Sequence, residues 1–217
     1  MKSTIGFFIA ILVLTSCTKE KISGAGPLAS DQRSPGAFPG ISFEGKGELT
    51  INNSTQPEVI ISGYRNILPY IETTVGIDGI LHIRPRSGFV LTNTQLKVTV
   101  SMSVLNKLEL SGETEATVAD PFQGDILELN ASGKSNIFWP AASFYKTVKV
   151  SSSGESIIKG FPLVCDSLLL TASGNTASEF TVNEHIRGEI SGQGILYYKG
   201  NPTTDVTITG SASIQKK

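Results

Sequence analysis

The stretch LELNASGK, residues 127–134, places two leucines two positions apart and follows them with small residues that end in glycine. VKVSSSGE (148–155) and LLLTASGN (168–175) repeat this order. Apolar residues at every second position are typical of a half-buried strand, and small residues with glycine are typical of a tight corner. The chain therefore repeats a strand that is followed by a corner.

The repeats return at a period near 20 residues. Six apolar anchors mark the copies at intervals of 19, 21, 20, 20 and 18: Leu110, Leu129, Val150, Leu170, Ile190 and Ile208. A unit of this size with one strong strand cannot bury its apolar face alone, so the copies must stack. The segments between the anchors lack helical apolar spacing. We predict an all-β fold, a parallel β-solenoid with rungs of about 20 residues.

The small residues of the repeats predict a corner at which equivalent side chains lie above one another. Glycine suits such a corner because it has no Cβ and tolerates a positive φ. The expected ladder is Gly112, Gly133, Gly154, Gly174 and Gly194. A row of displayed hydroxyl groups is the functional alternative, but the columns mix Ser, Asn and Thr.

Residues 39–105 are also β-like but less regular than residues 106–214, and both segments are expected to form one domain over residues 39–217. Gly76-Ile77-Asp78-Gly79 between two alternating runs predicts a hairpin turn. The sequence leaves open whether this front half continues the solenoid or caps its end.

The N-terminus has the features of an export signal. Lys2 is followed by an apolar run over residues 5–14, which is shorter than the roughly 20 residues that span a bilayer. Leu14-Thr15-Ser16-Cys17 resembles the lipobox of bacterial lipoproteins. We expect a signal peptide over residues 1–16, and Cys17 lipidated as the first residue of the mature chain.

Residues 17–38 are rich in Gly, Pro, Ala and Ser and predict a tether that holds the domain about 25 Å from the anchor. Thr18-Lys19 after Cys17 has no aspartate retention signal, which favours the outer membrane. The face of the membrane stays open.

The composition excludes some classes of protein. The net charge of −1 gives no attraction to nucleic acid. Because Cys17 is assigned to the lipid, Cys165 has no partner for a disulfide, and its apolar neighbours predict a buried side chain. We expect no cofactor.

Several stretches together resemble the head GIN domain family of auto-transporter adhesins, which is common among lipoproteins of Bacteroidota. They are PEVIISGYRNILPYIETTVGIDGILHIRP (57–85), LELSG (108–112), LELNASG (127–133) and ISGQGILYYKGNP (190–202). The resemblance covers about residues 41–214. It implies an exported, right-handed β-helical protein without associated catalytic residues.

The segment NIFWPAASFYK (136–146) concentrates aromatic side chains. Exposed rings would stack on sugars or on a partner protein, whereas buried rings would plug or cover the solenoid. The candidate ligand-contact residues are Phe138, Trp139, Phe144 and Tyr145.

Residues with catalytic or metal-binding potential are sparse. Neither His82 nor His185 has a second ligand at metal-site spacing, so no metal site is expected. Two carboxylate pairs keep a polysaccharide-cleaving enzyme open as an alternative. These pairs are Asp120 with Asp125, and Glu109 with Glu128, which the alignment places on successive rungs.

The sequence favours a lipid-anchored, non-catalytic module of the cell envelope that serves recognition or scaffolding. Its expected partners are the membrane, through the N-terminal lipid, and a glycan or an envelope protein. A carboxylate enzyme and a subunit that stacks end to end are the alternatives, and the oligomeric state stays open.

Overall fold

The computed structural model describes residues 19–217, so the predicted signal peptide and Cys17 lie outside the described residues. Within this part of the chain there are β-strands and one 3-10 turn but no α-helix, so the all-β prediction is confirmed. The elements are β1 (Glu20–Ser23), β2 (Leu28–Arg33), β3 (Gly40–Asn53), β4 (Glu58–Tyr64), η1 (Leu68–Tyr70), β5 (Ile71–Val75), β6 (Leu81–Pro85), β7 (Phe89–Thr92), β8 (Lys97–Met102), β9 (Lys107–Val118), β10 (Gln123–Phe138), β11 (Ser143–Ser152), β12 (Ile157–Ala172), β13 (Ala177–Ile190), β14 (Ile195–Lys199), β15 (Thr203–Ile208) and β16 (Ser213–Lys216).

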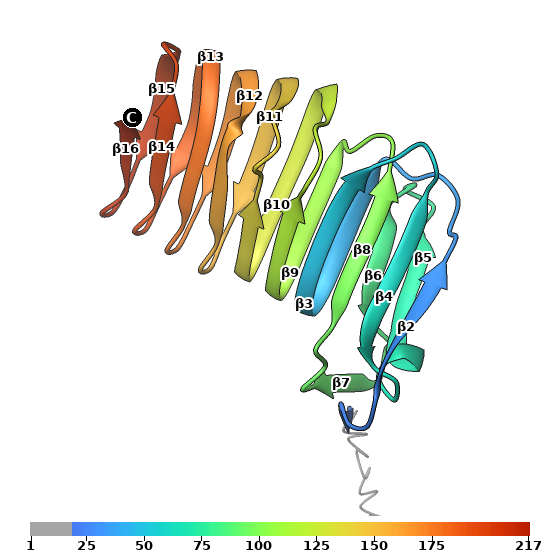
Figure 1. The fold of residues 1–217 in the computed structure, drawn as a ribbon. Coiled ribbons are helices and arrows are strands. Elements are labelled where there is room, and N and C mark those ends of the chain that lie inside the picture. The colour runs from blue at the N-terminus through green and yellow to red at the C-terminus, as the bar shows by residue number, and fades with distance from the viewer. Residues whose placement is uncertain (1–18) are drawn as a thin grey trace, which may run out of the picture.

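Strands β9 to β13 lie side by side in chain order, and each pairs in parallel with the next (Figure 1). Leu129 lies beside Leu108 on one side and beside Val150 on the other. Leu170 lies between Val150 and Gly188. β14 and β15 both pair with β13, and β16 pairs with β14. Each copy of the repeat is thus hydrogen-bonded to the copy before it.

Two of the predicted alignments between copies were wrong by two residues. Leu110 lies beside Ala131 and not beside Leu129, and Ile190 lies beside Ala172 and not beside Leu170. A slip of two residues keeps every side chain on the same face of a strand. The apolar pattern therefore could not distinguish the predicted register from the observed one. In the structure, the stacking of the corner glycines defines the observed register.

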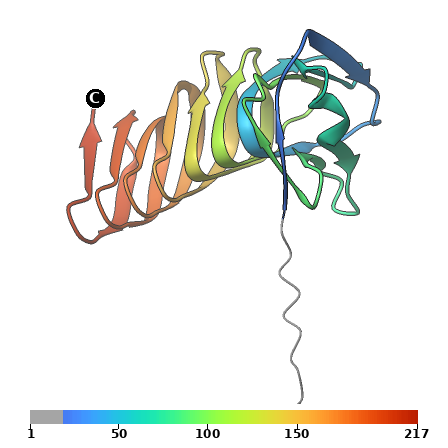
Figure 2. The same cartoon turned by 90° about the horizontal axis from the view of Figure 1, so that it is seen from below.

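The apolar side of each copy faces the interior of the molecule. Leu108, Leu129, Val148 and Leu168 are buried. The next residue along each of these strands, such as Lys149 or Leu169, points to the outer surface. Seen from below, the copies follow one another from the N-terminal strands to the C-terminus (Figure 2). One continuous core runs along this row.

The front half both extends the parallel row and covers its end. β3 pairs in parallel with β9 on one edge and with β6 and β8 on the other. β4 then pairs antiparallel with β8, β2 pairs antiparallel with β4, and β5 pairs antiparallel with β6. Gly76 donates its N–H to the carbonyl of Ile80 at 2.9 Å and closes the β5–β6 turn, so the predicted hairpin is confirmed.

The prediction of a tether without strands was wrong over residues 20–33. β1 pairs in parallel with β7, and β2 pairs antiparallel with β4. β1 and β2 lie at the outside of the fold and contribute few side chains to the core, where Ile22 and Ala29 are partly buried. A hydrophobic pattern does not report such pairing.

Candidate functional site

Four of the five predicted corner glycines lie directly above one another. A Cβ added to Gly133 would lie 2.7 Å from the carbonyl oxygen of Gly112, and one added to Gly154 would lie 2.6 Å from the carbonyl oxygen of Gly133. Gly174 continues the same line above Gly154. All four have positive φ, which glycine adopts without steric cost. At this corner the backbones of successive copies therefore approach one another more closely than any residue with a Cβ would allow.

The assignment of Gly194 to this ladder was wrong. Gly192 lies above Gly174 and has φ +79, whereas a Cβ on Gly194 would lie 3.0 Å from the hydroxyl of Thr176. The error has the same origin as the two-residue slip between Leu170 and Ile190. Gly45 and Gly210 extend the ladder at its two ends.

Trp139 and Tyr145 are fully buried, so their assignment as ligand contacts was wrong. Their rings meet edge to face at 6.4 Å. The Trp139 Nε1–H donates to the Ser143 hydroxyl at 2.8 Å, and the Tyr145 hydroxyl donates to the Leu105 carbonyl at 2.6 Å. These rings fill the core, as the alternative interpretation of the segment predicted.

Phe138 and Phe144 are exposed by 47% and 42%, respectively. Phe138 pairs with Lys159 of the next copy, whereas Phe144 pairs with Val164. The segment does not bring its four aromatic side chains to one surface, because alternate residues of a strand point to opposite sides.

His82, His185 and Cys165 lie on three different strands and do not contact one another. His82 Nε2 lies 3.2 Å from the carboxylate of Asp78, and His185 Nδ1 lies 2.7 Å from the Thr203 hydroxyl. Burial raises the pKa of Cys165 to about 12, which keeps the thiol protonated at neutral pH. Residues 19–217 contain no cluster of three or more His, Cys, Asp or Glu side chains that could hold a metal ion.

The expected stack of Glu109 and Glu128 was wrong. Glu128 lies between Lys107 and Lys149 of the neighbouring copies, and Glu109 lies beside Asn130. Partial burial acts to raise the pKa of Glu109, but the Lys107 ammonium at 2.8 Å, together with hydrogen bonds from Asn130 and Ser42, outweighs it and lowers this pKa. A general acid requires a raised pKa.

Asp120 and Asp125, the second carboxylate pair, bind other groups and not each other. Asp120 accepts the backbone N–H of Asn53 at 3.0 Å, and Asp125 pairs with Lys146 at 2.7 Å. Each carboxylate is therefore held by its own partner.

A groove with a volume of about 660 Å³ lies where the front half meets the repeats. We call it the amide groove, because amide side chains stand among charged side chains along its walls. Its polar lining residues are Lys46, Glu48, Asn93, Thr94, Gln95, Lys97, Glu113, Thr114, Glu115, Lys134 and Asn136.

The loop between β7 and β8 forms one wall of the amide groove and is strained. Asn93 has φ +49 and Gln95 has φ +45, and they are the only non-glycine residues of positive φ among residues 19–217. Such conformations cost about 1–3 kcal/mol each and cluster at functional sites. Thr94 between them is buried and its hydroxyl donates to the Lys46 carbonyl at 3.4 Å, which fixes the loop.

Four of the six charged side chains of the amide groove form two ion pairs. Lys46 Nζ lies 2.7 Å from Glu113, and Lys97 Nζ lies 2.9 Å from Glu48. The hydrogen bond from Lys46 lowers the pKa of Glu113, so this carboxylate is ionised at neutral pH. The groove thus presents donors and acceptors without a large net charge.

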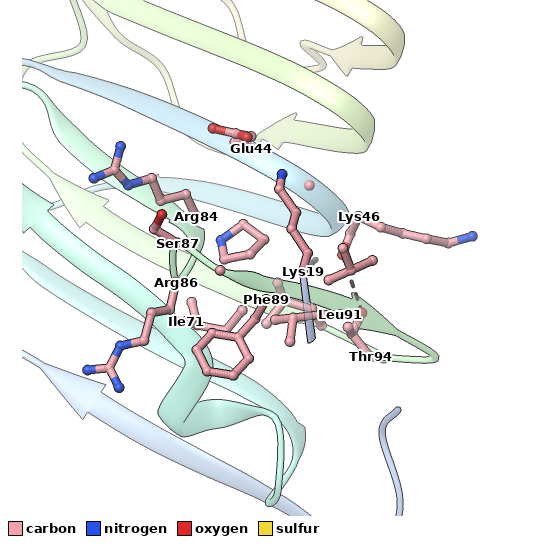
Figure 3. Close-up of a pocket in the computed structure, with 15 residues that line it drawn as sticks. Lys19, Glu44, Lys46, Ile71, Arg84, Arg86, Ser87, Phe89, Leu91 and Thr94 are labelled. Atoms are coloured by element: carbon pink, nitrogen blue, oxygen red, sulfur yellow. Dashed lines mark hydrogen bonds between the residues drawn. The ribbon is translucent and has the colours of Figure 1, made fainter. Parts of the chain in front are cut away.

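A second hollow of about 490 Å³ adjoins the amide groove and shares Lys46, Thr94 and Leu96 with it (Figure 3). We call it the basic hollow, because Lys19, Arg84 and Arg86 line it. Glu72 lies 3.4 Å from Arg84 and 3.8 Å from Arg86, so two guanidinium groups share one carboxylate.

The family model described as "Putative auto-transporter adhesin, head GIN domain" matches residues 37–143 and 141–202. The chain belongs to this family. The match runs from β3 to β14, and it confirms the family that the sequence resembled. A comparison with curated proteins finds no match.

Two solved structures share the fold of this GIN-family chain. One from Bacteroides fragilis, titled a putative adhesin, has a TM-score of 0.70 at 20% identity and covers 90% of this chain and 100% of its own. One from Parabacteroides distasonis, titled a putative lipid binding protein, has a TM-score of 0.58 at 19% identity and covers 91% and 100%. At these identities the similarity establishes the fold alone.

The sequence of this GIN-family chain did not predict the amide groove. The stretch TNTQ (92–95) has no pattern that predicts a strained loop, although asparagine tolerates positive φ better than most residues. The sequence did not predict the basic hollow either, because Lys19 and Arg84 are brought together only by the pairing of β1 with β7. No helix within residues 19–217 has the length and hydrophobicity needed to cross a bilayer.

Proposed function

We propose that this chain is a lipid-anchored, non-catalytic module of the bacterial cell envelope that binds a glycan in the amide groove. The observation that carries this proposal is the lining of the groove, in which Asn93, Gln95 and Asn136 stand among lysine and glutamate side chains. Sugar hydroxyls both donate and accept hydrogen bonds, which amides and carboxylates complement.

Family membership and the state of the carboxylates support a non-catalytic role. The carboxylates that sequence reasoning offered for an enzyme are each held by lysine or by backbone, and Glu109 has a lowered pKa. The lipobox-like Leu14-Thr15-Ser16-Cys17 supports an anchor at Cys17 and export to the outer membrane.

A glycan array tests binding, with the release of products from each bound polysaccharide measured in parallel. Asn136→Ala removes one amide from the groove, and we expect an affinity about fivefold weaker, which is the loss of one hydrogen bond. Gln193→Ala is the matched control, because Gln193 is exposed on a later copy outside the groove.

Three outcomes would contradict this proposal. Equal losses in the two variants would exclude the amide groove as the binding site. Product release from a bound polysaccharide would favour the carboxylate enzyme. Capture of an envelope protein by cross-linking, without binding of any glycan, would favour a protein partner.

We further propose that the parallel copies form a right-handed β-helix. The parallel pairs from β9 to β16 support a solenoid, and the hand is the one that the family resemblance implies. A crystal structure at a resolution that traces the connections between copies would test the hand directly.

A further inference from the structure

We propose that the basic hollow is a docking surface for the anionic phosphate headgroups of the membrane that carries the anchor. This inference rests on the proposed lipidation of Cys17 but not on the proposed glycan site. It assigns one face of the domain to the bilayer. The orientation of the parallel strands relative to the membrane then follows from this contact.

The position of the first described strand places the hollow close to the anchor. β1 begins at Glu20, whose N–H donates to the Gly88 carbonyl at 2.8 Å. Lys19, immediately before it, lines the basic hollow. Only two residue steps separate Cys17 from Lys19, and a chain spans at most about 7 Å over that length. The headgroup layer of a bilayer is about 5 to 8 Å thick, so the backbone at Lys19 cannot rise clear of it.

The pairing of β1 removes the freedom that a tether would give. Residues 20–23 pair with residues 89–92 in parallel register. The loop that carries Arg86, Ser87 and Gly88 is therefore held beside the anchor. All three residues are exposed, and Val90 beside them is exposed by 43%.

The side chains of the basic hollow suit a phosphate. Figure 3 shows Lys19, Arg84 and Arg86 along its wall together with one carboxylate, Glu44. Glu72 neutralises one of the two arginines, and neither contact, at 3.4 and 3.8 Å, is a tight bidentate pair. Guanidinium donors thus remain for phosphate oxygens, which arginine binds in a forked geometry.

The experiment compares the lipidated protein in two kinds of vesicle, one of phosphatidylcholine and one that also contains phosphatidylglycerol. Hydrogen exchange of residues 86–91 is measured against residues 203–208 as an internal reference. We expect exchange of residues 86–91 to slow about fivefold or more in the anionic vesicles, since each basic residue contributes about that factor near an anionic surface. High salt should remove the difference.

Two double variants separate the basic hollow from net charge. Arg84→Gln with Arg86→Gln should abolish the slowing. Lys159→Gln with Lys216→Gln removes the same amount of charge from the repeats. This second double variant should leave the slowing of exchange unchanged.

Equal exchange in the two vesicles would overturn the docking surface. The same slowing by inorganic phosphate in detergent solution would also overturn it, because the hollow would then be a site for free phosphate. Mass spectrometry of the same sample reports whether Cys17 carries lipid, so a failure of the anchor is distinguished from a failure of docking.

Discussion

Gly154 shows how one residue determines the corner of each repeat. Its backbone has φ +75, and a Cβ there would lie 2.6 Å from the Gly133 carbonyl oxygen. Two separate requirements, a left-handed backbone and a close approach, therefore act at one position. Alanine, which has a Cβ, neither adopts a positive φ readily nor allows so close an approach.

Gly154→Ala should lower the free energy of unfolding by about 3 kcal/mol, of which about 1 to 2 kcal/mol comes from the left-handed conformation alone. Gly26→Ala is the matched control, because Gly26 has φ +84 but nothing lies within 4 Å of its added Cβ. We expect a loss of about 1 kcal/mol there. Urea unfolding measures both, and equal losses would show that the close approach does not contribute.

At the scale of a strand, charges of opposite sign alternate along the outer face of the repeats. Successive copies place Lys107, Glu128 and Lys149 in one column, and Leu169, Arg187 and Asp205 continue it. Leu169 interrupts the alternation, because it lies between Lys149 and Arg187 and is exposed by 39%. The column favours the native register over a shift that would bring like charges together.

Leu169→Glu would place a carboxylate between two cations, whereas Leu169→Lys would place a third cation there. Exposed ion pairs contribute about 0.2–1 kcal/mol, so the Glu variant should exceed the Lys variant by about 1 kcal/mol in the free energy of unfolding. Urea midpoints at low and high salt measure the difference, with Leu169→Gln as the uncharged reference. A difference that persists undiminished at high salt would contradict an electrostatic cause.

At the scale of the whole molecule, the front half covers one end of the parallel row. Arg33 on the outer strand β2 holds this end together. Its guanidinium pairs with Asp31 at 2.8 Å and donates to the Ile71 carbonyl and the Thr73 hydroxyl, both at 2.8 Å. β2 covers an edge of β4 that would otherwise be free to pair with another chain.

Arg33→Ala should lower the free energy of unfolding by about 2 kcal/mol, because hydrogen bonds from a charged donor are lost. It should also increase light scattering on heating, as the edge of β4 becomes exposed. Arg65→Ala is the control, an exposed arginine of the same end. Calorimetry and scattering measure both variants, and identical behaviour would show that Arg33 does not secure β2.

The sequence by itself determined the all-β class, the stacked copies and the family, since these depend on local patterns. Apolar alternation defines a strand, and glycine at a regular interval defines a corner, wherever the chain lies. It also predicted the buried state of Cys165, which follows from its apolar neighbours.

Only the tertiary structure decided the register, the structure of residues 20–33 and the amide groove and basic hollow. A two-residue slip leaves the apolar pattern unchanged, so the stacking of glycines had to choose between Gly192 and Gly194. β1 and β2 are held by backbone hydrogen bonds to strands distant in sequence, which composition does not encode. The amide groove and the basic hollow join residues from separate strands and loops, and this proximity exists only once the copies are stacked.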